Sequence, residues 1–303
     1  MEIRVSIIML VYNHERFIRY ALDSILSQRV NFEYELIIGE DCSPDNSRVI
    51  IKEYESKFKG KMHAIYREKN IGVKRNFFDC LGKSKGKYIA FLEGDDWWTD
   101  PLKLQKMSDF LHDHSQYSAV AHNYSIVDAE NRFLRNGLVY EKLFVFTKEE
   151  LEMYRLPSQT STLMIRNIVT DFKKNYLRKL KKYMWIPGDR ILALLLLQYG
   201  DIAVLPDIMS VYHYYIEAGG TNWSSNHPRE DYLCTFRIMC GMEKLGKKIK
   251  YPLDMKKIKV YIFQKNIGQW TKSKVHLYIQ CLHMLIFSIH KLSFLKSVLA
   301  NYR

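Results

Sequence analysis

Short apolar runs alternate with helically spaced apolar positions over the first hundred residues. Residues 5–11 form a near-continuous apolar run rich in β-branched side chains, which is typical of a strand buried on both faces. A helical pattern follows, carried by Phe17, Ile18, Ala21, Leu22, Ile25 and Leu26. The alternation then predicts strands at 35–39, 62–66 and 88–92, and helices at 47–58, 73–81 and 101–111, the last starting at Pro101. Such spacing indicates parallel βαβ units with right-handed crossovers.

The pattern is less regular after residue 111. It predicts strands at 119–127, 143–146, 161–165, 202–205 and 209–215, and a helix at 189–199 that is apolar on most sides. Pro228 marks a boundary, because the sequence beyond it is helical and basic, without obvious strands. We therefore predict an α/β domain over residues 1–227 and a helical basic extension over residues 228–303.

Composition excludes several classes of protein. Hydrophobic residues make up 47% and charged residues 26%, which excludes a disordered chain, a collagen and a fibrous repeat. The five cysteines include no C-x-x-C pair, which excludes a disulfide scaffold and a cysteine-based zinc site and favours a reducing compartment. We see no signal peptide, and no uncharged run reaches the roughly 18 to 20 residues of a spanning helix. These features predict a cytoplasmic protein.

Positive charge is concentrated near the C-terminus. The formal net charge is +13, and residues 244–303 contain thirteen Lys or Arg but one acidic residue, so this last fifth carries almost all of it. A basic tail on a nearly neutral body suggests an anionic partner. Residues 275–299 are mostly apolar with basic flanks, which favours a helix that lies on an anionic membrane surface or packs on the body. The predicted location is therefore peripheral, at the inner face of the cell membrane.

Acidic residues follow two of the predicted strands, where ligands bind in open α/β sheets. Glu93, Asp95 and Asp96 lie within four residues of one another, and a Mg²⁺ or Mn²⁺ ion would relieve their mutual repulsion. A turn rich in Asp is the alternative explanation. Asp41 comes after Glu40 at another strand end, and such positions suit a nucleotide base and ribose. No G-x-G-x-x-G loop is present, which disfavours a dinucleotide site.

Asp189 opens the apolar helix after Pro187-Gly188. It is either an N-cap, a position that Asp suits well, or a general base that takes a proton from a hydroxyl group. Local sequence alone leaves both readings open.

Five separated motifs together resemble glycosyltransferase family 2, of the bacterial polysaccharide type. They are VSIIMLVYNHERFIRYALDSILSQ, ELIIGEDCSPDNS, NIGVKRNF, GKYIAFLEGDDWWTDPLKLQKM and WIPGDRILALLLLQYGDIAVLPDIMSVYHYY, and they cover roughly residues 3–223. The resemblance implies the GT-A nucleotide-diphospho-sugar transferase fold, with a mostly parallel central sheet. It also implies an inverting, metal-dependent transfer from a nucleotide sugar, a UDP-sugar by family precedent, to a saccharide or lipid-linked acceptor in surface polysaccharide synthesis.

The resemblance also assigns roles to residues. Asp189 would be the catalytic base, Asp41 would accept from the uracil ring N–H, and Asp95 would be the main ligand of Mn²⁺ or Mg²⁺. The other donor-binding residues would be Tyr12, Asn13, Asn70, Lys74, Arg75, Glu93 and Asp96. The motif here is E-x-D instead of D-x-D, and Tyr212-His213-Tyr214-Tyr215 departs from the family's Tyr-Arg-x-His. His213 is therefore either a second metal ligand or a packed strand histidine.

Acceptor contacts are predicted from residue type. Trp98 and Trp185 flank the acidic motifs, and tryptophan rings stack on the apolar faces of sugars, although core packing explains them equally well. Thr160 lies in a polar stretch, residues 158–162, that either contacts acceptor hydroxyls or is a plain loop.

Two other functions compete with this prediction. A nucleotidyltransferase that forms sugar nucleotides usually carries a glycine-rich basic loop after the first strand, where this chain has Tyr12-Asn13-His14-Glu15. A nucleic-acid-binding protein would interleave aromatic and basic residues in its tail, but the apolar run here is too continuous. We therefore predict no nucleic-acid partner.

Overall fold

The computed structural model describes residues 2–137, 139–168, 177–214 and 232–268. Its centre is a ten-stranded sheet in the order β3-β2-β1-β4-β9-β6-β10-β5, with β7 paired to β6 and β8 paired to β10. The strands are β1 (Ile3–Val11), β2 (Glu33–Glu40), β3 (Met62–Tyr66), β4 (Tyr88–Glu93), β5 (Trp97–Trp98), β6 (Tyr117–Val127), β7 (Phe133–Asn136), β8 (Phe144–Phe146), β9 (Met164–Arg166) and β10 (Asp201–His213).

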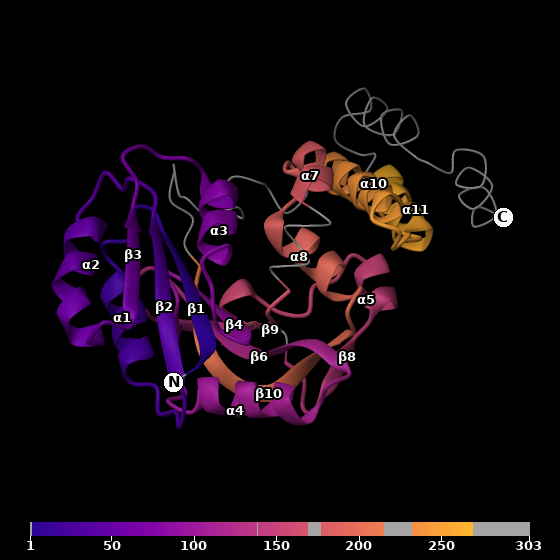
Figure 1. Ribbon diagram of the computed structural model, residues 1–303. Coiled ribbons are helices and arrows are strands. Elements are labelled where there is room, and N and C mark those ends of the chain that lie inside the picture. Colours follow the sequence, from indigo (N-terminus) through magenta and orange to yellow (C-terminus); the bar gives the residue numbers. More distant parts are fainter. Residues whose placement is uncertain (1, 138, 169–176, 215–231, 269–303) are drawn as a thin grey trace.

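The first half of the sheet is parallel. β1 pairs in parallel with β2 and with β4, and β2 pairs in parallel with β3. The connecting helices are α1 (Ile18–Leu26), α2 (Ser47–Glu55) and α3 (Val73–Leu81). β1, β2 and β4 are therefore neighbours whose carboxyl ends meet at one edge of the sheet, as the alternating pattern predicts (Figure 1).

The second half mixes strand directions. β6 and β10 are parallel, whereas β9 runs antiparallel to both β4 and β6 and joins the two halves. The helices and 3₁₀ turns of this half are α4 (Lys103–Asp113), α5 (Lys148–Glu152), η2 (Thr160–Thr162), α7 (Leu177–Leu180), η3 (Lys181–Tyr183), α8 (Gly188–Leu196), α10 (Tyr232–Lys248) and α11 (Lys256–Gly268). A further 3₁₀ turn, η1 (Ser56–Phe58), follows α2 in the first half.

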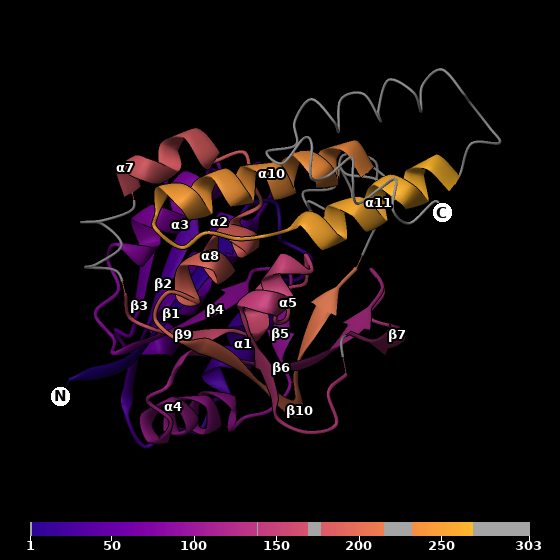
Figure 2. The same cartoon turned by 90° about the vertical axis from the view of Figure 1, so that its right-hand side faces the viewer.

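Side chains of β1 alternate between two hydrophobic cores, one on each face of the sheet. Val5, Ile7 and Met9 pack with helices α1, α2 and α4, while Ile8 and Leu10 face a second core. The second core also holds the buried leucines of α8 and the inner face of α10 (Figures 1 and 2). α10 thus shares a core with the sheet. The predicted boundary at residues 227 and 228 lies outside the described residues.

Three sequence predictions were wrong in detail. The strands expected at 202–205 and 209–215 are one strand, β10, whose register shifts between Leu205 and Ile208 around Pro206. The helix expected from Pro101 begins at Lys103, because the Asp100 carboxylate accepts the Leu102 N–H at 2.7 Å in a preceding turn. The strand expected at 161–165 begins later, as β9 at Met164, because residues 160–162 form the turn η2.

The described helices include none that is long and apolar enough to cross a bilayer. The apolar run at 275–299, for which a membrane-surface helix is predicted, lies outside the described residues.

Candidate functional site

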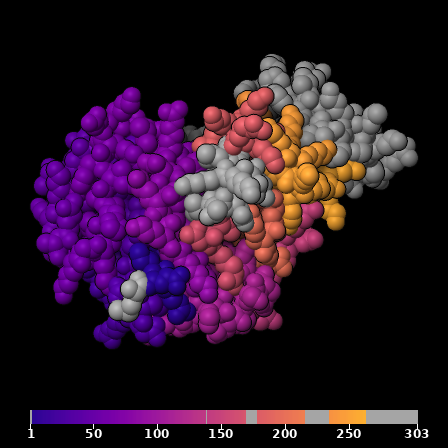
Figure 3. All heavy atoms as spheres, viewed as in Figure 1, coloured from indigo at the N-terminus to yellow at the C-terminus, as the bar shows by residue number. Residues whose placement is uncertain are grey.

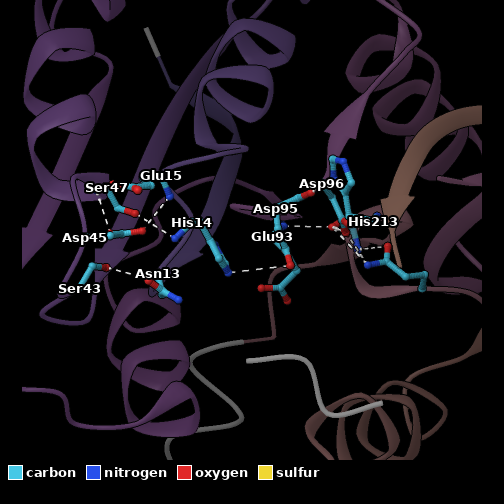
Figure 4. A network of polar contacts seen from close by, with 12 residues as sticks. Asn13, His14, Glu15, Ser43, Asp45, Ser47, Glu93, Asp95, Asp96 and His213 are labelled. Carbon is cyan, nitrogen blue, oxygen red and sulfur yellow. Dashed lines mark hydrogen bonds and ion pairs between the residues drawn. The ribbon is translucent and has the colours of Figure 1, made fainter. Parts of the chain in front are cut away.

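The loops that follow β1 and β2 are joined by a set of hydrogen bonds (Figure 4). Backbone N–H groups of the first loop donate to side chains of the second: Asn13 to Ser43 Oγ at 3.2 Å, His14 to Ser47 Oγ at 2.9 Å and Glu15 to Asp45 Oδ2 at 2.9 Å. Asn13 and Cys42 have φ angles of 62° and 59°, a region that non-glycine residues enter rarely and that is enriched at functional sites. The two strand ends therefore form one constrained surface, with the exposed Tyr12 and Asn13 at its rim.

Asp41 fixes the loop that precedes α3 through two hydrogen bonds. It is 3% exposed, and its carboxylate accepts the backbone N–H groups of Ile71 at 2.8 Å and Gly72 at 2.9 Å. Asn70 Oδ1 also accepts from Gly72, whose φ of 86° requires glycine. Each carboxylate oxygen retains a second lone pair, so the predicted hydrogen bond from a uracil ring remains available to Asp41.

Glu93 and Asp95 stand at the end of β4. Burial, reinforced by the Asp95 charge, raises the pKa of Glu93 to about 8. The Asp95 carboxylate lies 3.9 Å from Nε2 of His14, which comes from the β1 loop (Figure 4). Gly94 makes this possible, because a Cβ there would lie 2.6 Å from His14 Nδ1. The acidic motif thus concentrates negative charge beside the joined loops of β1 and β2.

Asp96 has a different setting from its neighbours. It is 1% exposed, and its carboxylate accepts from Ser161 Oγ at 2.6 Å, Gln159 Nε2 at 2.6 Å and the His213 N–H at 3.1 Å. Ser161 Oγ in turn accepts the Glu93 N–H at 3.0 Å. Asp96 therefore ties β4, η2 and β10 together. A direct contact between Asp96 and the donor, which the resemblance implies, stays a prediction that would require one of these bonds to open.

His213 is packed within the strand and engaged at both ring nitrogens. Nδ1 contacts the Asp95 carbonyl, Nε2 lies 2.6 Å from Asn131 Oδ1, and the ring packs against Phe17 with centroids 4.2 Å apart and planes tilted by 37°. Burial lowers the pKa of His213, which favours the neutral ring. These contacts favour the alternative in which His213 is a packed strand histidine. Metal coordination by His213 stays a prediction and would have to displace one of the two contacts.

Asp189 lies in the first turn of α8, but the N-cap of this helix is Pro187. Asp189 Oδ1 accepts the N–H of Arg190 at 2.7 Å, and the second oxygen is not part of that bond. The capping explanation for Asp189 therefore does not hold. The carboxylate is half-buried in the first turn of the helix.

Lys74 connects the donor side with the segment that leads to Asp189. From the first turn of α3, its ammonium group donates to the carbonyl of Ile186 at 2.9 Å and also to that of Met184. Burial lowers the pKa of Lys74 and the nearby Asp189 charge opposes this shift. The Asp41 loop, α3 and the start of α8 are therefore neighbours, as a single cleft requires. Arg75, the next residue, is exposed.

The three residues predicted to contact the acceptor differ in accessibility. Trp98 is 3% exposed, donates from Nε1 to the Ser161 carbonyl at 3.0 Å and has Lys103 Nζ 4.0 Å from its ring centroid, so a sugar could reach it only if these neighbours moved. Trp185 is 53% exposed, and Thr160 is half-buried at the start of η2.

Some supporting residues were missed from sequence. Gln159 and Ser161 were considered only as possible acceptor contacts, and His14 only as a strand-end residue, yet all three hold the acidic motif in place. Their positions could have indicated this role. Gln159 and Ser161 are polar residues just before β9, which pairs with β4, and His14 follows the end of β1.

Comparison with known proteins decides the family. The family model described as Glycosyl transferase family 2 matches residues 6–172, more than half of the chain. The chain belongs to this family. Its fold is GT-A, a fold also seen in the crystal structure of S. aureus TarS residues 1–349 in complex with UDP-GlcNAc, with a TM-score of 0.66 and 19% identity over 93% of this chain and 80% of that one.

Two other proteins have a higher sequence identity to this chain than TarS has. An uncharacterized protein of Mycobacterium tuberculosis is 34% identical over 212 residues, which are 68% of this chain and 58% of that protein. The minor teichoic acid biosynthesis protein GgaB of Bacillus subtilis is 41% identical over 113 residues, which are 36% of this chain and 12% of GgaB. The match thus spans about three fifths of the mycobacterial relative and a small part of GgaB.

Proposed function

We propose that this glycosyltransferase moves a sugar from a UDP-sugar to a hydroxyl group of a saccharide acceptor, with inversion, during the synthesis of a cell-surface polysaccharide. One observation carries the proposal: the loops after β1, β2 and β4 meet at one edge of the sheet, and Lys74 links them to the segment that carries Asp189. The UDP-GlcNAc complex of TarS and the teichoic acid role of GgaB support this choice of donor and pathway.

The donor would occupy the joined loops. Tyr12, Asn13 and Asn70 line the exposed rim, Asp41 offers carboxylate lone pairs to a ring N–H, and the exposed Arg75 is available to phosphate oxygens. Arginine suits this role because its planar fork of donors matches phosphate geometry.

A divalent cation fits the end of β4. Burial, with the Asp95 charge second, raises the pKa of Glu93 to about 8, and a cation beside the two carboxyl groups would favour their ionised forms. Hard carboxylate oxygens are also the ligands that Mg²⁺ and Mn²⁺ prefer. The described residues include no cluster of three or more His, Cys, Asp or Glu side chains arranged for a metal, so Asp95 and Glu93 would share the ion with donor phosphates and water. When bound, the cation would neutralise charge on the leaving diphosphate.

Asp189 would act as general base. Its carboxylate takes the proton of the acceptor hydroxyl while that oxygen bonds to C1 of the sugar and the bond from C1 to the diphosphate breaks. Base catalysis of this kind typically contributes about 10² to 10⁴ in rate. A single displacement inverts the anomeric centre, so an α-linked donor gives a β-glycoside.

A donor screen with Mn²⁺ or Mg²⁺ that measures release of nucleoside diphosphate tests the proposal. We expect Asp189→Asn and Asp95→Asn to lose at least about 100-fold in turnover. Asp95→Asn alone should also weaken metal-dependent nucleotide binding, measured by calorimetry. The control is Asp113→Asn, an exposed acid at the end of α4, which should behave as wild type. Normal rates in both site variants would refute the assignment.

Lipid linkage of the acceptor and attachment of the C-terminal segment to an anionic membrane surface belong to the same proposal. They are supported by the concentration of positive charge in residues 244–303. Vesicle sedimentation at low and high salt checks the attachment.

A further inference from the structure

α10 presents a row of basic residues on its outer face. Arg237, Lys244 and Lys248 are exposed and follow one another at intervals of seven and four residues, which places them on one side of the helix. The opposite side is buried in the core through residues such as Met239, Met242 and Leu245. The acid of this helix, Glu243, lies on the buried side and pairs with Lys259 at 2.5 Å, so it does not offset the positive row.

This row lies beside the segment that leads to Asp189. Gly241 falls between Arg237 and Lys244, and a Cβ on it would lie 2.7 Å from Cζ2 of Trp185, so the indole rests directly on the α10 backbone. About two turns further on, Lys248 Nζ is 5.8 Å from the ring centroid of Tyr183. The positive row therefore borders the exposed Trp185, only a few residues from the proposed catalytic base.

A second set of cations continues the row. Arg178, Lys181 and Lys182 are exposed on α7 and η3, which lie against α10 (Figure 2). Residues 172–188 contain six Lys or Arg and no acid. In Figure 3 the salmon surface of α7 adjoins the orange surface of α10. We call Arg178, Lys181, Lys182, Arg237, Lys244 and Lys248 the basic ridge.

We propose that the basic ridge binds an acceptor polymer that carries repeated phosphate groups, and that it guides this polymer past Trp185 toward Asp189. This inference rests on the proposed function and specifies its acceptor. The ridge borders Trp185, in the segment that leads to Asp189.

The spacing of the cations favours a polymer. Residues seven apart on a helix are separated by about 10 Å, so Arg237 and Lys244 would contact different phosphates along one strand. An exposed indole between the cations can stack on a sugar that lies between two phosphates. Such contacts are weakened by salt, because exposed charges are screened over about 8 Å at physiological ionic strength.

Long-chain inorganic polyphosphate serves as the probe, with binding measured by fluorescence anisotropy at low and physiological salt. The charge reversal Lys244→Glu with Lys248→Glu should weaken binding at least about tenfold, since two ridge cations become anions. The matched control is Lys52→Glu on α2 with Lys57→Glu on η1, two exposed lysines remote from the ridge, which should change affinity less than about twofold. The pair Lys181→Gln and Lys182→Gln gives a milder second test.

The outcomes separate this inference from the proposed function. UDP binding and the far-ultraviolet spectrum should be unchanged in the ridge variants, which shows that the donor site and fold are intact. The proposed role of the basic ridge is refuted if ridge and control variants lose polyphosphate binding equally. It is also refuted if neither ridge variant loses polyphosphate binding. If the ridge variants lose binding to phosphatidylglycerol vesicles but not to polyphosphate, the ridge faces a membrane and the inference is wrong. Failure of Asp189→Asn to affect turnover would instead refute the proposed function.

Discussion

The proposed donor side, on the first half of the sheet, and the opposite side, on the second half, are built in opposite ways. On the proposed donor side, consecutive strand–helix units place their loops together, and partners such as His14 and Ser47 are 33 residues apart. The opposite side is joined to β4 through Asp96, which accepts from Ser161 and His213, 65 and 117 residues away. The first side thus follows from regular local order, whereas the second depends on a few buried junctions. A substitution at a buried junction should therefore lower the free energy of unfolding more than a substitution at a loop contact.

The largest effect is expected at the Asp96 junction. Asp96→Asn replaces one carboxylate oxygen with an N–H₂ group. That group faces either Ser161 and Gln159, which donate to Oδ2, or the His213 N–H, which donates to Oδ1. Buried donors left without an acceptor should lower the free energy of unfolding by about 2–4 kcal/mol. Urea denaturation checks this. The comparison on the proposed donor side is Ser47→Ala, which removes the acceptor of the His14 N–H. This change should lower the free energy of unfolding by about 1 kcal/mol. Equal losses would remove the distinction between the two sides.

An intermediate effect is expected at Lys74, where the two sides meet. Lys74→Met removes the bonds to the carbonyls of Met184 and Ile186 and loosens the segment before Asp189. We expect kcat to fall about tenfold, equivalent to about 1.4 kcal/mol, while the KM for the donor changes less than about threefold. Steady-state kinetics with varied donor concentration checks this. A raised donor KM with normal kcat would instead place Lys74 on the donor phosphates, as the family resemblance implies.

The smallest effect concerns the buried lysine under Trp98. Burial holds the pKa of Lys103 well below its usual value, and within the described residues its ammonium group has no hydrogen-bond partner. Over the range between the lowered pKa and about 10.4, the unfolded chain binds more protons than the folded one, so stability rises with pH. Lys103→Met should raise the free energy of unfolding at pH 7 by about 1 kcal/mol and flatten its rise toward pH 10. A slope as steep as that of wild type would contradict this.

The difference between the two sides also explains what could be predicted from the sequence. The periods of apolar residues located β1, β3 and α3 to within a few positions, and the rule for strand ends located Asp41 and Asp95. The bond from Asp96 to His213 has no local signature, because polar residues at 159–161 and a histidine at the end of β10 are equally compatible with loop and packing roles. Trp98 and Trp185 show the same limit: they have the same side chain and both neighbour acidic motifs, yet one is 3% and the other 53% exposed.

The close approach of Gly241 to Trp185 bears on the proposed choice of acceptor. The indole occupies space that exists only because position 241 has no side chain. A bulkier residue at 241 would displace the ring, which lies four residues before the proposed base, without altering any group proposed to handle protons or phosphates. On the proposed assignment, variation on α10 would change which acceptors are bound while the chemistry stays the same.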